Sequence, residues 1–153
     1  MLADVLAACE AVDSSTIVAR EGHQGQAVEN ALRGVESGPI LVVNADLPCV
    51  KPRDLLALLG AQPEGGLALV EAEDGTTNAL ALAAPHLFAP VYGPGSAGRF
   101  RARAERLEVP VVAARIPNLA DDVDTLADLE RLEPRLGPHT AAAFGQLQAG
   151  LVG

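Results

Sequence analysis

The sequence has few aromatic residues, few cysteines and no long apolar run. Aromatic residues make up 3% of its 153 residues and tryptophan is absent, so Leu, Val, Ile and Ala must build the core. Two cysteines, Cys9 and Cys49, are too few for a disulfide framework or a structural zinc site. No stretch approaches the roughly 18 consecutive apolar residues of a membrane span. We therefore expect a soluble, cytoplasmic protein without a membrane partner.

Positive charge is also scarce. The chain has 11 Lys and Arg against 20 Asp and Glu, and its net charge is −9. A surface that follows a nucleic-acid backbone needs a basic patch, so this balance argues against a nucleic-acid partner. It is compatible with a small phosphorylated ligand, which a few backbone N–H groups and a metal ion can hold.

Segments typical of strands and helices alternate along the chain. The expected strands are 16–19, 40–43, 67–70, 76–82 and 110–116, and the expected helices are 1–12, 26–35, 52–60, 97–107, 126–132 and 140–151. This alternation predicts the α/β class, as a three-layer α/β/α sandwich. We expect one domain over residues 1–153, in which residues 134–153 form a C-terminal helical tail.

The stretch from Pro39 to Pro48 predicts the strand around which the chain is organised. Residues 40–43 form an unbroken apolar run, which is typical of a central strand covered on both faces in a parallel sheet. Pro48 prevents further ladder pairing, so Asp46 lies just past the carboxyl end of that strand. Ligands bind at this edge of open α/β sheets. The alternative is a turn aspartate that caps the following loop.

A second polar stretch, Tyr92-Gly93-Pro94-Gly95-Ser96, leads into the helix expected at 97–107. The N–H groups of Gly93, Gly95 and Ser96, together with the Ser96 hydroxyl, would face an anion at the helix N-terminus. The alternative is an ordinary helix cap. Three arginines share one face of this helix, which we expect to be solvated: Arg99, Arg103 and Arg106.

A third stretch, 121–124, holds three carboxylates in four residues, which repel one another unless a cation or solvent intervenes. Alternation in an extended segment would place Asp122 and Asp124 on the same side. With Asp46 they would form an oxygen-rich site for Mg²⁺, whose remaining ligands are commonly phosphate oxygens. The alternative is a solvated acidic turn before a helix capped by Thr125.

Four motifs occur in the order seen in one family. They are Ala45-Asp46-Leu47-Pro48, Gly75-Thr76-Thr77-Asn78-Ala79-Leu80, Tyr92-Gly93-Pro94-Gly95-Ser96 and Asp122-Val123-Asp124-Thr125. From about Gly25 to its C-terminus, the chain resembles the guanylyltransferases of coenzyme F-420 biosynthesis, the CofC/FbiD family. Those enzymes join GTP to 2-phospho-L-lactate or phosphoenolpyruvate and release pyrophosphate. The resemblance implies a nucleotidyltransferase with a nucleotide-diphospho-sugar transferase-like fold.

The resemblance also implies roles for individual residues. Catalysis and Mg²⁺ binding would fall to Asp46, Asp122 and Asp124. The phosphate of the acceptor would be held by Thr77, Gly93 and Ser96. The resemblance assigns no residue to the nucleotide base, for which the sequence itself offers only Gln24, Gly25 and Asn30 as candidates.

Members of this family begin with a strand and a loop bearing Gly, Lys and Arg, which cradles the triphosphate. The first segment of this sequence, the helix expected at 1–12, corresponds to the helix that follows that unit in the family. We therefore expect the unit to be missing and turnover with GTP to be poor. Two alternatives stay open. One is a truncated, non-catalytic domain that binds a phospho-acid and a metal, and the other is a related transferase with another nucleotide or acceptor.

Overall fold

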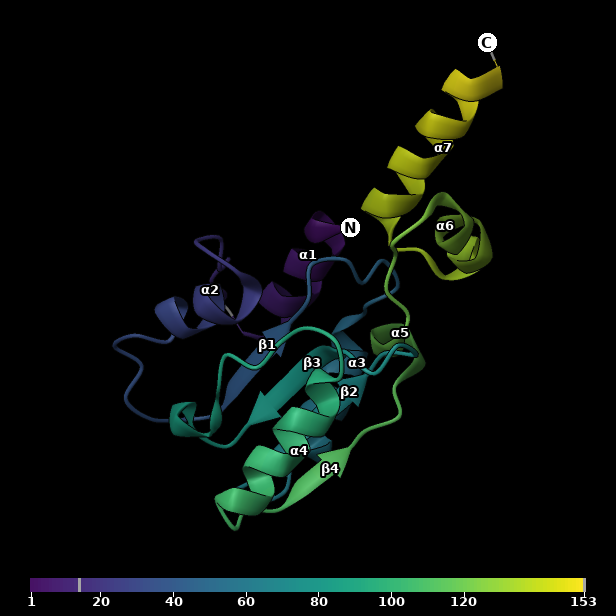
Figure 1. The fold of residues 1–153 in the computed structure, drawn as a ribbon. Coiled ribbons are helices and arrows are strands. Elements are labelled where there is room, and N and C mark those ends of the chain that lie inside the picture. Colours follow the sequence, from purple (N-terminus) through teal and green to yellow (C-terminus); the bar gives the residue numbers. More distant parts are fainter. Residues whose placement is uncertain (14, 153) are drawn as a thin grey trace.

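The computed structural model describes residues 1–13 and 15–152, so Ser14 and Gly153 of the expected domain lie outside it. Its strands are β1 Ile40–Val43, β2 Leu67–Glu71, β3 Thr77–Leu82 and β4 Val111–Ala113. Its α-helices are α1 Leu2–Val12, α2 Gln24–Ala31, α3 Pro52–Ala61, α4 Ser96–Arg106, α5 Pro117–Ala120, α6 Leu126–Leu132 and α7 Pro138–Val152. Two short 3₁₀ helices, η1 Pro85–Leu87 and η2 Glu133–Arg135, complete the set. Figure 1 shows these elements around one open sheet.

The sheet is mixed, with the strand order β1-β3-β2-β4. Strand β3 runs antiparallel to both β1 and β2, and only β2 and β4 pair in parallel within the described part of the chain. The prediction of a central strand in a parallel sheet is therefore wrong for β1, which lies at one edge. Its apolar run is explained by packing on both faces, because Leu41 and Val43 contact one core while Ile40 and Val42 contact the other. Such a run indicates covered faces and does not specify strand direction or order.

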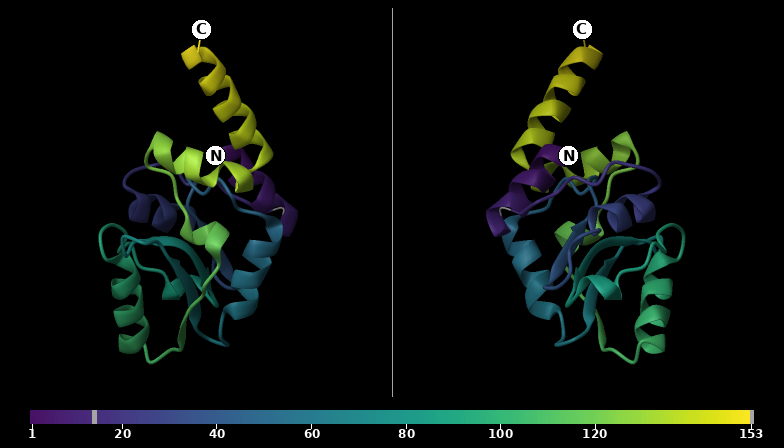
Figure 2. Two further views of the ribbon diagram at one scale, coloured as in Figure 1. Left: turned by 90° about the vertical axis from the view of Figure 1, so that its right-hand side faces the viewer. Right: turned by 90° about the vertical axis from the view of Figure 1, so that its left-hand side faces the viewer.

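The two faces of the sheet carry separate cores, which confirms the predicted three-layer arrangement. Leu67 and Leu69 of β2 lie on the face covered by α2 and α4, where they pack with Phe100. Val70 lies on the opposite face, covered by α1, α3 and α5, and packs with Leu55. Figure 2 shows the helices on either side of the sheet.

Two expected strands differ from the structure. Residues 16–19 form no strand, and Ile17 is 67% exposed. Their β-branched residues favour an extended backbone, but strand formation also needs a neighbour to pair with and to pack against. The last expected strand is shorter, because β4 ends at Ala113 and Pro117 starts the unpredicted helix α5. Proline fits this first helical position because its missing N–H is not needed there.

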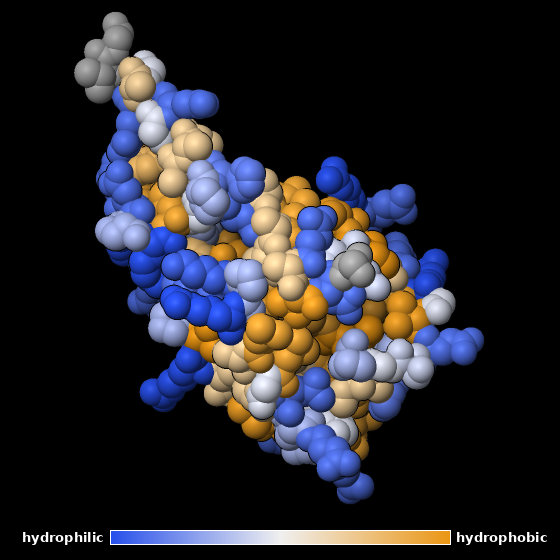
Figure 3. Space-filling view, turned by 180° about the vertical axis from the view of Figure 1, so that it is seen from behind, coloured by the Kyte–Doolittle hydropathy of each residue, from blue (hydrophilic) through white to orange (hydrophobic). Residues whose placement is uncertain are grey.

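Helix α7 projects away from the sheet, past α1 and α6 (Figures 1 and 2). On the face seen from behind, apolar side chains cover much of the body of the molecule (Figure 3). Exposed large hydrophobic residues of the described chain include Leu56 and Leu147. In the described residues, no helix combines the length and the apolar character that membrane crossing requires. The cytoplasmic location and the single-domain assignment stay predictions.

Candidate functional site

The candidate site lies where β1 ends beside the start of β3. The backbone N–H of Asn44 donates to the Asn78 carbonyl oxygen at 2.9 Å, which extends the β1–β3 pairing by one step. Asp46 follows two residues later and is half-buried. Within the described residues, its Oδ1 atom is buried without a hydrogen-bond partner. Burial raises the pKa of Asp46, and the charge of Asp124 raises it further.

The acidic loop 121–124 follows α5 and lies against this strand end. Its Val123 N–H donates to the Asp46 carbonyl oxygen at 3.2 Å. Burial raises the pKa of Asp122, and the charges of Asp46 and Asp124 add to the shift. The structure therefore brings the three carboxylates predicted to bind metal into one neighbourhood.

The arrangement is open and does not enclose an ion. Among the described residues, no three His, Cys, Asp or Glu side chains gather closely enough to form a complete metal cluster. The donor set is still compatible with Mg²⁺, because one or two of these carboxylates would be enough for an ion that takes its other ligands from water and phosphate. The partnerless Oδ1 of Asp46 supports this fit, since buried polar atoms normally have a partner. The metal assignment of Asp46, Asp122 and Asp124 stays a prediction.

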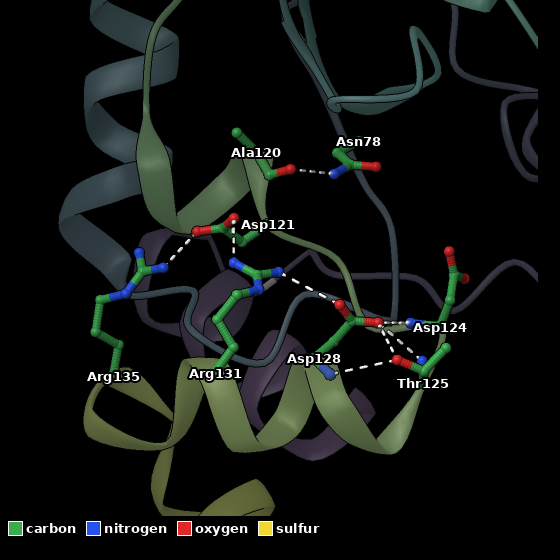
Figure 4. Close-up of polar contacts among 8 residues, drawn as sticks. All are labelled: Asn78, Ala120, Asp121, Asp124, Thr125, Asp128, Arg131 and Arg135. Carbon is green, nitrogen blue, oxygen red and sulfur yellow. Dashed lines mark hydrogen bonds and ion pairs between the residues drawn. The ribbon is translucent and has the colours of Figure 1, made fainter.

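Two sets of contacts hold the acidic loop in place (Figure 4). On one side, the Asp121 carboxylate accepts hydrogen bonds from Arg131 at 3.2 Å and from Arg135. This ion-paired role was not expected, because the sequence grouped Asp121 with its acidic neighbours. The arginines that pair with it come ten and fourteen residues later, a spacing that no short motif reveals.

On the other side, the predicted cap of α6 is confirmed. The Asp128 carboxylate accepts from the Thr125 N–H at 2.9 Å and from the Asp124 N–H at 3.3 Å, while Thr125 Oγ1 accepts from the Asp128 N–H. Hydrogen bonds from Thr125 lower the pKa of Asp128. No side chain of the described residues donates to the Asp122 or Asp124 carboxylate, and Asp122 is bonded by its own backbone N–H, so both carboxylates keep oxygen lone pairs for a cation.

The residues predicted to hold the acceptor phosphate lie together beside this site. The Ser96 hydroxyl donates to Thr77 Oγ1 at 3.0 Å, and both residues are buried. The Ser96 N–H donates to the Gly93 carbonyl oxygen at 2.9 Å. The Gly93 and Gly95 N–H groups bond to no described backbone atom, so they are the loop donors left for an anion. The phosphate-binding role of Thr77, Gly93 and Ser96 stays a prediction.

An arginine of α4 shapes this loop. Arg99 donates from Nε to the Val91 carbonyl, from Nη2 to the Tyr92 carbonyl and from Nη1 to the Pro94 carbonyl, at 2.9, 3.0 and 2.6 Å. Arg103 likewise donates to the carbonyls of the 86–87 segment. Arg99 is exposed, as expected of a solvated face, but both side chains also bind backbone carbonyls of the preceding segment, which was not expected. Helical spacing alone does not show that a preceding loop folds back onto the helix.

A hollow of about 420 Å³ opens next to Asp46. It is lined by Met1, Leu2, Gln24, Asn44, Ala45 and Asp46. Gln24, one of the three candidates for base binding, donates from Nε2 to Asn44 Oδ1 at 2.6 Å. Gly25 packs tightly against Pro90, because a Cβ added at Gly25 would lie 2.8 Å from the Pro90 Cα. Asn30 accepts from Gln26 on the same helix.

Several curated proteins are similar to this chain. A "Phosphoenolpyruvate guanylyltransferase" of Sphaerobacter thermophilus is 42% identical over 101 residues, which are 65% of this chain and 48% of that protein. Proteins of the same name from Rubrobacter xylanophilus and Geodermatophilus obscurus are 40% and 33% identical over 63% and 78% of this chain, and over 48% and 54% of their own lengths. The chain spans about half the length of the curated relatives it matches. No family model matches it.

Proposed function

The chain belongs to the family of these phosphoenolpyruvate guanylyltransferases, and we propose that it forms the acceptor-binding and metal-binding part of such an enzyme. The reaction would join GTP to phosphoenolpyruvate or 2-phospho-L-lactate and release pyrophosphate, in coenzyme F-420 biosynthesis. One structural observation supports the proposal independently of the relatives' names. Asp46 and the acidic loop share a hydrogen bond at the same sheet edge as the buried Thr77–Ser96 pair.

The proposed chemistry is a single displacement at phosphorus. An oxygen of the acceptor phosphate forms a bond to the α-phosphorus of GTP, the bond to the β-phosphate oxygen breaks, and pyrophosphate leaves with the electron pair. No side-chain nucleophile is needed, because the acceptor phosphate is already ionised. Asp46, Asp122 and Asp124 would hold Mg²⁺, which supplies charge stabilisation and alignment when bound.

The proposed roles of the remaining residues follow from their hydrogen-bonding groups and their positions. The free N–H groups of Gly93 and Gly95 would bind and orient the acceptor phosphate, in a loop that Arg99 holds in shape. Gln24 lines the hollow beside Asp46, where the nucleotide would enter. Alignment of the two phosphates by these groups is the main source of rate in a phosphoryl transfer that uses no covalent intermediate.

Three arginines around the site are already bound to other groups of the chain. This favours a second candidate function, a chain that binds acceptor and metal but turns over poorly by itself. Arg131 and Arg135 are paired with Asp121, and Arg99 is bound to loop carbonyls. None of these three side chains is therefore left free to neutralise a triphosphate. GTP binding should suffer more than acceptor binding.

Pyrophosphate release and calorimetry test both candidates. Release is measured with GTP against ATP, CTP and UTP, for each acceptor, with Mg²⁺ present. Calorimetry measures phosphoenolpyruvate binding to the same chain with and without Mg²⁺. Metal-dependent binding of phosphoenolpyruvate with slow, GTP-specific release is the expected result. Absence of metal-dependent phosphoenolpyruvate binding and of pyrophosphate release would overturn the proposed function.

A further inference from the structure

A buried amide lies between the two segments of the candidate metal site. Asn78, in β3, is 1% exposed. Its Nδ2 donates to the Ala120 carbonyl oxygen at 3.2 Å, next to the acidic loop (Figure 4). Its Oδ1 accepts from Asn44 Nδ2 at 3.4 Å, and its backbone carbonyl accepts from the Asn44 N–H. One side chain thus contacts the segment before Asp46 and the segment before Asp122.

These contacts close a ring of hydrogen bonds. Asn44 precedes Asp46 by two residues, and Ala120 precedes Asp122 by two residues. The Val123 N–H then donates to the Asp46 carbonyl oxygen, which joins the two segments a second time. The ring therefore ties the backbone that carries Asp46 to the backbone that carries the acidic loop.

The sheet itself does not require this side chain. The backbones of β1 and β3 are already paired in register, with Val43 opposite Ala79 and Val42 opposite Leu80. The Asn78 amide instead bonds outside the ladder, to Ala120 and to the Asn44 side chain. It therefore holds the segments around the site, and its bond to Asn44 also supports the last step of the β1–β3 pairing.

We propose that Asn78 is a positioning residue that sets the separation of Asp46 from Asp122 and Asp124 and so prepares them to bind one divalent cation. The inference rests on the proposed function. Asparagine suits the position because its amide offers a donor to Ala120 and an acceptor to Asn44 in one planar group. An ionised aspartate would offer two acceptors and no donor, and would place a fourth negative charge among three carboxylates.

The same amide network reaches the predicted acceptor site. Asn44 Nδ2 also donates to the Thr77 carbonyl oxygen at 3.2 Å, and the Thr77 hydroxyl accepts from Ser96. Loss of the Asn78 side chain should therefore disturb metal binding directly and phosphoenolpyruvate binding through Asn44. The metal effect should be the larger of the two.

The test compares Asn78→Ala and Asn78→Asp with the parent chain, using Mn²⁺ in the presence of phosphoenolpyruvate as the probe. Groups that hydrogen-bond a metal ligand directly typically change metal affinity by about 10- to 100-fold when replaced, and because Asn78 acts through the backbone beside the ligands we expect a loss of about tenfold in Asn78→Ala. Amide hydrogen exchange at Val123 is measured without metal and should become faster in both variants. Thr140→Val is the matched control: it removes a buried polar group far along the chain and should lower stability while leaving Mn²⁺ affinity and Val123 exchange unchanged.

The outcomes separate this inference from the proposed function. Unchanged Val123 exchange and unchanged Mn²⁺ affinity in Asn78→Ala would overturn the inference, as would an equal loss of affinity in Thr140→Val. A parent chain that binds no Mn²⁺ would overturn the proposed metal site, while Val123 exchange would still decide whether Asn78 holds the loop. If Asn78→Ala does not fold, Asn44→Ala removes the other half of the amide pair at a half-buried position and must show the same two changes.

Discussion

The Asp4 carboxylate of α1 binds Thr140 in the first turn of α7, which joins residues near the two ends of the chain. Asp4 Oδ2 accepts from the Thr140 hydroxyl at 2.6 Å and from the Thr140 N–H at 2.7 Å, while Oδ1 accepts from the His139 N–H at 3.0 Å. The carboxylate thus satisfies N–H groups that a helix start leaves without partners. Burial opposes its ionisation, but the hydrogen bonds from Thr140 and His139 outweigh burial and lower the pKa of Asp4.

The first prediction concerns the pH dependence of this contact. Because the pKa of Asp4 is lowered by folding, its contribution to stability is fully present above the ordinary value of 3.8 and is lost as pH falls through the folded value. Asp4→Asn should lower the free energy of unfolding at pH 7 by about 1.5–3 kcal/mol, the range for hydrogen bonds to a charged group. Urea unfolding of the parent and the variant from pH 7 to pH 3 measures the difference in their free energies of unfolding. This difference should become smaller once the pH falls below 3.8, the ordinary pKa of aspartate. A difference that stays constant over this range would contradict the prediction.

The second prediction uses two glycines near or in the same helix. A Cβ on Gly137 would lie 2.4 Å from the Asp4 Cγ, whereas a Cβ on Gly145 would meet nothing within 4 Å. Gly137→Ala should therefore destabilise the chain by displacing Asp4. Gly145→Ala should be neutral or stabilise it by up to about 1 kcal/mol, because alanine favours a helix interior. Thermal unfolding of the two variants checks the contrast, and a Gly137→Ala variant as stable as Gly145→Ala would refute it.

Local signals in the sequence predicted most elements, and the errors concern long-range relationships. The Thr125 cap correctly placed the start of α6, because a capping box depends on neighbours within three residues. The apolar run at 40–43 correctly indicated a strand, but its edge position and antiparallel pairing depend on β3, nearly forty residues later. For the same reason, neither the ion pairs of Asp121 nor the loop contacts of Arg99 could be read from spacing. The site residues were named from strand ends and a resemblance, while Asn44 and Asn78 became candidates only once their partners were known.

The third prediction concerns the stability that the chain loses, when no metal is bound, by holding several carboxylates close together at the candidate metal site. Asp46 has a buried oxygen without a partner among the described residues and lies near the carboxylates of Asp124 and Asp122. Asp46→Asn removes that charge, so we expect the variant to be more stable than the parent at pH 7 without metal. Mg²⁺ should raise the melting temperature of the parent, because a ligand that binds only the folded state stabilises it, and should not raise that of the variant. Melting curves with Mg²⁺ or with EDTA test both statements, and a destabilised Asp46→Asn chain would argue against the carboxylate crowding.

The last prediction concerns the loop that would hold the acceptor. Arg99 and Arg106 are both exposed on the same helix, but Arg99 bonds to three carbonyl groups of residues 91–94. Arg99→Met keeps the aliphatic part of the side chain and removes all three hydrogen bonds. Because Arg99 is itself exposed, we expect a loss of only about 1 kcal/mol in phosphoenolpyruvate binding, roughly fivefold in affinity, as the Gly93 and Gly95 N–H groups lose their fixed orientation. Arg106→Met changes charge equally and should leave affinity unchanged. Calorimetric titration with phosphoenolpyruvate at constant ionic strength distinguishes the two variants. Equal weakening in both would indicate that net charge, and not loop shape, controls acceptor binding.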